Sequence, residues 1–154
     1  MTTMLTLAEL EASTDRALGT SEWHEITQQQ IEQFAEATGD HQWIHVDPEA
    51  AASGPFGTTV AHGYLTLSML PMLLSEVVSV SDAVMGVNYG TEKIRFTSPV
   101  PSGSRVRLHA TLARAERRGP SVIWTVGVQI EIEGKEKPAL VGEVVYMAAG
   151  APPG

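Results

Sequence analysis

The sequence has no cysteine among its 154 residues, which excludes disulfide bonds and thiol catalysis. It is also poor in positive charge, since 10 Lys and Arg residues against 18 Asp and Glu residues give a formal net charge of -8. Non-specific nucleic-acid binding requires a basic surface, so no nucleic-acid partner is expected. A small anionic ligand held by a local group of cations remains compatible with this charge.

Long hydrophobic runs are missing as well. The longest apolar run, around Leu65–Leu74, is too short and too interrupted to span a bilayer. The N-terminus lacks a basic segment followed by an apolar core, the pattern of a secretory signal peptide. We therefore expect a cytoplasmic location and no membrane partner. A hydrophobic content of 43% and a charged content of 18% indicate one globular domain over residues 1–154.

The first half of the chain carries helical patterns. Residues 1–20 are expected to form an N-terminal lead-in, with an amphipathic helix over residues 4–18, and residues 21–26 a short edge strand. Thr27 and Gln30 have the spacing of a capping box, and apolar residues at helical spacing predict a helix over residues 28–38. Gly39 fits the position after the end of that helix.

The next segment, from Asp40 to about Thr59, is expected to lie outside regular helix. The exception is a turn at Pro48–Ala52, with Asp47 as its cap. Apolar residues around much of the circumference then predict a largely buried helix over residues 62–80, kinked at Pro71.

The second half alternates apolar and polar residues, which is typical of strands. Strands are predicted from Val84 onward, over Arg105–Glu116, over Val122–Glu133 and over Leu140–Met147. Residues 148–154 are expected to be a loose tail. An antiparallel sheet of this kind needs a cover on its apolar face, and the buried helix is the candidate. The predicted fold class is therefore α+β, a curved antiparallel sheet around a mostly buried helix.

Two places in the first half combine residues that can carry chemistry. Asp40 and His45 lie five residues apart in a segment that begins at Gly39. Gly63 opens the predicted buried helix, where a backbone N–H can face a ligand that a side chain would otherwise exclude. On spacing alone, Asp40 is as readily a turn residue with a local side-chain bond, and His45 a structural histidine of the core.

The run Gly39-Asp40-His41-Gln42-Trp43-Ile44-His45, with Ala51 following, resembles the motif of MaoC-like (R)-specific enoyl-CoA hydratases, the hydratase 2 family. Val60-Ala61-His62-Gly63 resembles the second motif of that family. The segments Tyr89–Phe96 and Pro99–Gly103 are similar to its middle strand and turn. The family usually has Asn-Pro where this chain has Gln42-Trp43, and this variant resembles the branch named for nodulation protein N. The serine that family enzymes carry would fall near Pro71, where Ser68 is the nearest replacement.

The resemblance implies a hot dog fold and a hydro-lyase of fatty acid metabolism that hydrates trans-2-enoyl-CoA to (R)-3-hydroxyacyl-CoA. Asp40 and His45 would share the catalytic water, and the Gly63 N–H would stabilise the thioester enolate. The neighbours expected to contact the thioester are Val60, Ala61 and His62. The residues expected near the acyl chain or coenzyme A are Trp43, Tyr64, Gly86, Val87, Asn88 and Tyr89.

Several alternatives stay open. The same scaffold can act as an acyl-CoA thioesterase or as a non-catalytic protein that binds acyl thioesters. The substrate is acyl-CoA or an acyl-carrier-protein thioester, and a homodimer is expected because a curved sheet leaves free edges. No cofactor is expected, although Asp40, His41, His45 and Asp47 together could supply metal ligands. The arginines of the predicted strands are solvent-exposed or contact phosphates of coenzyme A. These arginines are Arg105, Arg107, Arg114, Arg117 and Arg118.

Overall fold

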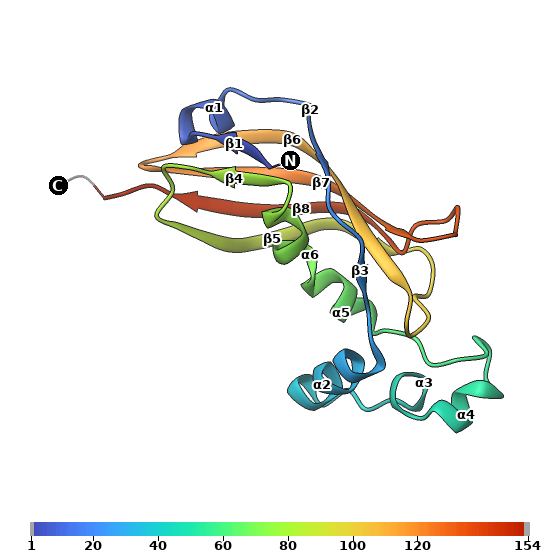
Figure 1. Cartoon of the computed structure of the whole chain (residues 1–154). Coiled ribbons are helices and arrows are strands. Elements are labelled where there is room, and N and C mark those ends of the chain that lie inside the picture. The colour runs from blue at the N-terminus through green and yellow to red at the C-terminus, as the bar shows by residue number, and fades with distance from the viewer. Residues whose placement is uncertain (1, 153–154) are drawn as a thin grey trace.

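The computed structural model describes residues 2–152 and contains one antiparallel six-stranded sheet. The strand order is β2-β6-β7-β8-β5, and β3 pairs with β6 as well (Figure 1). Four strands are long, as predicted: β5 (Met85–Phe96), β6 (Arg105–Arg118), β7 (Ser121–Ile132) and β8 (Leu140–Ala149). Two are short: β2 (Arg16–Thr20) and β3 (His24–Glu25).

The inner face of the curved sheet is covered by two short helices, α5 (Gly63–Ser68) and α6 (Leu70–Ser75), as Figure 1 shows. Alternate residues of β7, from Val122 to Ile132, are buried, as the period-two pattern predicted. Leu70 and Leu73 of α6 belong to the same core. The α+β class and the sheet-around-helix arrangement are therefore confirmed.

The single kinked helix predicted over residues 62–80 was wrong in its extent. The helix breaks at Met69, and Pro71 lies at the start of α6, where its missing N–H is not needed. Residues after Ser75 leave the helix, and β4 (Val78–Val80) forms a parallel pair with β1 (Thr3–Leu5). A run of β-branched valines favours a strand over a helix here.

The lead-in is structured differently from the predicted helix over residues 4–18. Only α1 (Leu7–Glu11) is helical, and Thr6 and Glu9 form its capping box. Leu5 belongs to β1 and Arg16 to Thr20 form β2, so the pattern of buried leucines combined three elements. At the other end, β8 reaches Ala149, two residues beyond the predicted strand, so the expected loose tail begins inside β8. Residues 153–154 of that tail lie outside the described part of the chain.

Residues 28–52 form a pendant segment that lies beyond the sheet (Figure 1). The helix predicted over 28–38 is confirmed as α2 (Gln28–Thr38), with both capping-box bonds and Gly39 in the left-handed conformation that suits glycine, at φ 81°. Two short helices follow, α3 (Trp43–Val46) and α4 (Pro48–Ala52). Asp47 caps α4 as predicted, whereas α3 was not expected.

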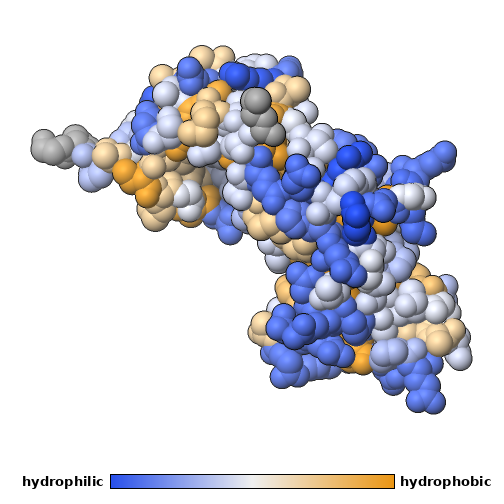
Figure 2. Space-filling model, in the orientation of Figure 1, coloured by the Kyte–Doolittle hydropathy of each residue, from blue (hydrophilic) through white to orange (hydrophobic). Residues whose placement is uncertain are grey.

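Figure 2 shows this pendant segment as a separate lobe with a largely hydrophilic surface over α2. Within residues 2–152, no helix is long and apolar enough to cross a membrane.

Candidate active site

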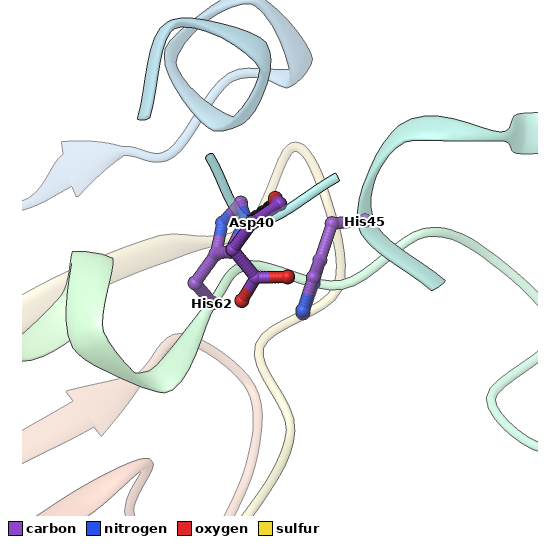
Figure 3. A group of neighbouring side chains, drawn as sticks. All are labelled: Asp40, His45 and His62. Carbon is purple, nitrogen blue, oxygen red and sulfur yellow. Dashed lines mark hydrogen bonds between the residues drawn. The ribbon is translucent and has the colours of Figure 1, made fainter. Parts of the chain in front are cut away.

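Three titratable side chains from three separate places meet beside the N-terminus of α5 (Figure 3). Asp40 lies in the loop after α2, His45 in α3, and His62 immediately before α5. One polar atom from each lies within 4.8 Å of the others. Asp40 is exposed, whereas only 7% of His45 and 2% of His62 are accessible. The fold therefore brings together an accessible carboxylate and two buried imidazoles.

The orientation of His45 is determined by one hydrogen bond. Its Nδ1 lies 2.7 Å from the carbonyl oxygen of Val60. A carbonyl oxygen only accepts hydrogen bonds, so Nδ1 must carry the proton. The neutral ring then has its lone pair on Nε2, as a general base requires.

The backbone of α3 is held by a side chain from α2. The Gln28 amide Nε2–H donates to the carbonyl of His45 at 2.8 Å. The Gln28 carbonyl oxygen accepts from the hydroxyl of Thr59 at 2.7 Å. Thr59 is a buried residue of the loop between α4 and α5. This bridge links His45 to the segment that leads to Gly63.

His62 contacts both members of the predicted pair. Its Nε2–H donates to the backbone carbonyl of Asp40 at 3.0 Å, and its ring stacks on His45 with centroids 3.9 Å apart. Phe34 of α2 also packs against the His62 ring, with centroids 4.8 Å apart. The Nδ1 atom of His62 is buried and has no hydrogen-bond partner within residues 2–152. His62 therefore links the Asp40 loop to the start of α5.

The local side-chain bond considered for Asp40 is present. Its Oδ1 accepts from the backbone N–H of Gln42 at 3.3 Å. This bond orients the carboxylate toward the two imidazoles in Figure 3. The turn role and the proposed chemical role of Asp40 are therefore compatible.

A cavity of about 270 Å³ lies at the N-terminus of α5 and is lined by Gly63, Ala61 and Phe96 among others, while Asp40, His45 and His62 are not among its lining residues. Gly63 is the first residue of α5, so its N–H has no partner inside the helix. Thr66, one turn later, also lines this cavity, and its buried hydroxyl has no partner within the described residues. A ligand here would meet the backbone donor of Gly63, whereas the Thr66 hydroxyl oxygen is itself inaccessible. Ser68, the suggested replacement for the serine of the family, instead donates to the carbonyl of Tyr64 in its own helix.

The metal-ligand set considered as an alternative, Asp40, His41, His45 and Asp47, does not form. His41 lies 3.4 Å from Glu36 on the surface, and Asp47 caps α4. Asp40, His45 and His62 could instead offer three ligand atoms within residues 2–152. The two imidazole planes are only 24° apart and their centroids 3.9 Å apart, so the in-plane lone pairs lie in two separate, nearly parallel planes, whereas ligands of one tetrahedral ion converge on it. This geometry does not suit the two rings as ligands of one tetrahedral ion.

The other predicted contacts are distributed along the molecule. Trp43 and Tyr64 are exposed beside the cluster, and the carbonyl of Val60 holds His45. Gly86 and Asn88 line a cavity farther along the sheet, and Asn88 and Tyr89 line a second one. Val87, between them on β5, is half-buried. All five arginines considered for phosphate contacts form ion pairs with glutamates.

Sequence reasoning missed Gln28, Thr59 and Thr66. Gln28 is the first residue of α2, where a polar side chain is unremarkable by pattern. Thr59 and Thr66 are hydroxyl residues in apolar surroundings, and only their burial distinguishes them from others. No local signal connects these residues, because their partners lie 17 to 31 residues away or are absent.

A family model described as "MaoC like domain" matches residues 9–133. The chain is 48% identical over 146 residues to 3-hydroxyacyl-thioester dehydratase Z of Mycobacterium tuberculosis, covering 94% of this chain and 97% of that protein. It is 47% identical over 139 residues to nodulation protein N of Rhizobium leguminosarum, covering 88% and 86%. The unliganded R-hydratase PhaJ1 of Pseudomonas aeruginosa has a similar fold, with a TM-score of 0.74, 22% identity and coverage of 96% and 87%.

Proposed function

This chain belongs to the MaoC-like dehydratase family, a family of hydro-lyases, and we propose that it adds water reversibly to trans-2-enoyl-CoA to give (R)-3-hydroxyacyl-CoA. The observation that carries this proposal is the His45–Val60 hydrogen bond, which leaves the Nε2 lone pair of His45 beside the Asp40 carboxylate. A carboxylate and an imidazole of this kind can hold one water between them.

The proposed reaction moves one water across the double bond. As the water oxygen bonds to C3, its proton passes to the Asp40–His45 pair, and the pair delivers one proton to C2. No net proton is gained or lost by the protein. The exposed Asp40 can approach the substrate, while the buried His45 is held in one orientation.

Negative charge develops on the thioester oxygen when C3 is attacked. We propose that the Gly63 N–H donates to this oxygen, because it begins α5 beside the cavity and lacks a helical partner. Ala61 and Val60 would contact the thioester through the segment that leads to Gly63.

A thioesterase remains the second candidate, since the same water could be directed at the thioester carbon. The presence of both Asp40 and His45 favours the hydratase. The test is an assay on crotonyl-CoA that follows the enoyl absorbance and free-thiol release together. Loss of enoyl absorbance without thiol release supports hydration, thiol release supports the thioesterase, and neither change supports a binding protein. An (R)-specific hydroxyacyl-CoA dehydrogenase then reports the configuration of the product.

We also propose that His62 is a positioning residue for the pair. His62→Gln keeps an N–H near the place of Nε2, whereas the shorter side chain of His62→Asn cannot reach the Asp40 carbonyl. His62→Asn should therefore lower kcat on the order of ten- to a hundredfold with a smaller change in KM, because it displaces the Asp40 loop. His62→Gln should recover much of this loss. Equal kcat values for both variants would contradict a positioning role.

The proposed assembly is a homodimer joined through β5. This strand is twelve residues long, forms one edge of the sheet and exposes Met85 and Tyr89, and Val84 just before it is exposed as well. Figure 2 shows hydrophobic surface over the connection from β4 to β5. A long exposed edge strand can pair with the same strand of a second copy.

Light scattering at micromolar concentration should give a dimer mass. Met85→Lys/Tyr89→Lys should shift the protein toward monomer, because each charge would be buried in the joint. The control is Met4→Lys, which is exposed on β1 outside the six-stranded sheet. A monomeric wild-type protein, or equal masses for the two variants, would rule out the β5 interface.

A further inference from the structure

His45 lies in an element that is too short to hold its own shape. The helix α3 has only four residues, and Gln42 at its N-cap makes no side-chain capping hydrogen bond. Helices of this length are not stable in water on their own. The last carbonyls of a helix have no N–H partner within it, and the carbonyl of His45 is one of these. Contacts from outside α3 must therefore determine where the ring of His45 lies.

Val60 provides the first of these contacts. Its N–H donates to the carbonyl of Ile44 at 3.0 Å, and its carbonyl accepts from Nδ1 of His45 at 2.7 Å. These two bonds hold the backbone of α3 and the ring of His45 against the same residue, three positions before Gly63. They leave the carbonyl of His45 without a donor.

Gln28, the first residue of α2, provides that donor. Its amide N–H donates to the carbonyl of His45 at 2.8 Å, and its amide oxygen accepts from the hydroxyl of Thr59 at 2.7 Å. A carbonyl only accepts hydrogen bonds, so the amide nitrogen, and not its oxygen, must face His45. Thr59 is 4% exposed, and its own carbonyl accepts from the N–H of Ser102 at 2.9 Å. The bridge therefore runs from α3 through Gln28 to a buried residue that is itself anchored.

We propose that Gln28 is a positioning residue for hydration, because its bridge sets the place of the His45 ring relative to the Gly63 N–H. This inference rests on the proposed function, in which His45 holds the water and the Gly63 N–H meets the thioester oxygen. Thr59 lies four residues before Gly63, so one side chain joins the two parts of the site. Gln28 is not among the residues that line the cavity at Gly63, so it acts through His45 and not on the substrate.

The physical reason is the cost of leaving polar groups without partners. Loss of the Gln28 amide would leave the carbonyl of His45 without a donor and the buried hydroxyl of Thr59 without an acceptor. Such groups shift toward water or toward other partners. The backbone of α3 would move with its carbonyl, and the ring of His45 would move with α3. A displacement of about 1 Å in a catalytic group can lower the rate about a hundredfold.

The first test compares two variants of Gln28 on crotonyl-CoA. Gln28→Met has a similar length and helix propensity and makes neither bond of the bridge. Gln28→Glu can still accept from Thr59 but cannot donate to His45. Both should lower kcat on the order of ten- to a hundredfold with a smaller change in KM. The matched control is Gln29→Met, which should keep the wild-type kcat, because Gln29 is the next residue of α2 and is exposed.

Substitutions of Thr59 test the other end of the bridge. Thr59→Val keeps the shape of the side chain and removes the hydroxyl, whereas Thr59→Ser retains it. Thr59→Val should therefore lower kcat, and Thr59→Ser should keep most of it. Adding Thr59→Val to Gln28→Met should lower kcat little further, because the hydroxyl has already lost its acceptor. Losses of kcat that add across the two positions would contradict a single bridge.

The spectrum of the His45 ring gives a readout that does not depend on turnover. The bond to Val60 places the proton on Nδ1, and nitrogen-15 NMR of labelled histidine distinguishes this tautomer from the other. His45→Asn identifies the signals. Gln28→Met should shift them toward a mixture of the two tautomers, while Gln29→Met should leave them unchanged. A residue that only stabilised α2 would lower the melting temperature without this change.

Wild-type kcat in both Gln28 variants would overturn the inference. Unchanged His45 spectra in Gln28→Met would overturn it as well, because they would mean that the ring keeps its place without the bridge. If neither Gln28 variant folds, equal kcat values for Thr59→Val and Thr59→Ser would overturn it instead. Absence of crotonyl-CoA hydration by the wild-type protein would contradict the proposed function, and the spectra would still show whether Gln28 orients His45.

Discussion

Asp40→Asn and His45→Gln are each expected to lower kcat for enoyl-CoA hydration by at least about a hundredfold, the scale of losing a general acid or base. Asn at position 40 can still accept from the backbone N–H of Gln42, so the loop should keep its shape. His45→Gln should also lower stability, because it disturbs the buried hydrogen bond from His45 Nδ1 to the carbonyl of Val60. A buried carbonyl left without a donor costs about 1–3 kcal/mol. Steady-state kinetics, with the melting temperature of each variant, give the comparison.

His45→Asn refines this test. Its amide nitrogen lies near the place of Nδ1, so it can still donate to Val60 while offering nothing in the place of Nε2. It should lose as much kcat as His45→Gln and retain more stability. The neighbouring pair His41→Gln and Asp47→Asn serves as a control, since His41 faces Glu36 and Asp47 caps α4. Near wild-type turnover in either Asp40→Asn or His45→Asn would remove that residue from the mechanism.

Gly63→Val is expected to abolish most activity, by about 10²-fold or more, while the Asp40–His45 pair stays intact. A Cβ at position 63 would lie 3.0 Å from the ring of Phe96, which lines the same cavity. A side chain there would therefore enter the space where the thioester oxygen is proposed to meet the Gly63 N–H. The measurement is kcat against melting temperature for Gly63→Ala and Gly63→Val.

The Phe96 contact allows a sharper control. Phe96 is partly exposed, so Phe96→Leu should be tolerated and should relieve the crowding caused by Gly63→Ala. If Gly63 serves catalysis, Gly63→Ala/Phe96→Leu should recover stability but little of the lost kcat. If position 63 is glycine only because a side chain there would contact the Phe96 ring, the double variant should recover both stability and kcat. That second outcome would leave the developing enolate without its proposed backbone donor.

The elements predicted correctly from the sequence are those whose stabilising interactions lie within their own residues. The capping box at Thr27 and Gln30 and the glycine at position 39 define α2 within their own span, and each was read from the sequence. The long strands were predicted for a similar reason, since alternation over a dozen residues has few other interpretations. The four residues of α3 are too few to show a helical period. They depend on Gln28, which lies 17 residues from its partner His45.

The site was predictable in its members and less so in its geometry. Asp40, His45 and Gly63 were chosen from the sequence and its family resemblance, and the structure brings them to the N-terminal end of α5. The stacking of His62 on His45 and the placement of Thr66 could not be predicted, because they depend on how the pendant segment meets α5.

The central claim, that Asp40 and His45 direct a water to C3 of an enoyl thioester, is tested most directly by following the oxygen of that water. The wild-type protein is incubated with crotonyl-CoA in water labelled with heavy oxygen, and the products are analysed by mass spectrometry. The wild-type protein should place the label in the 3-hydroxyl group of an intact hydroxyacyl-CoA, and Asp40→Asn should form this product at least about a hundredfold more slowly. Label in the carboxylate of a released acid, with none at C3, would contradict this claim.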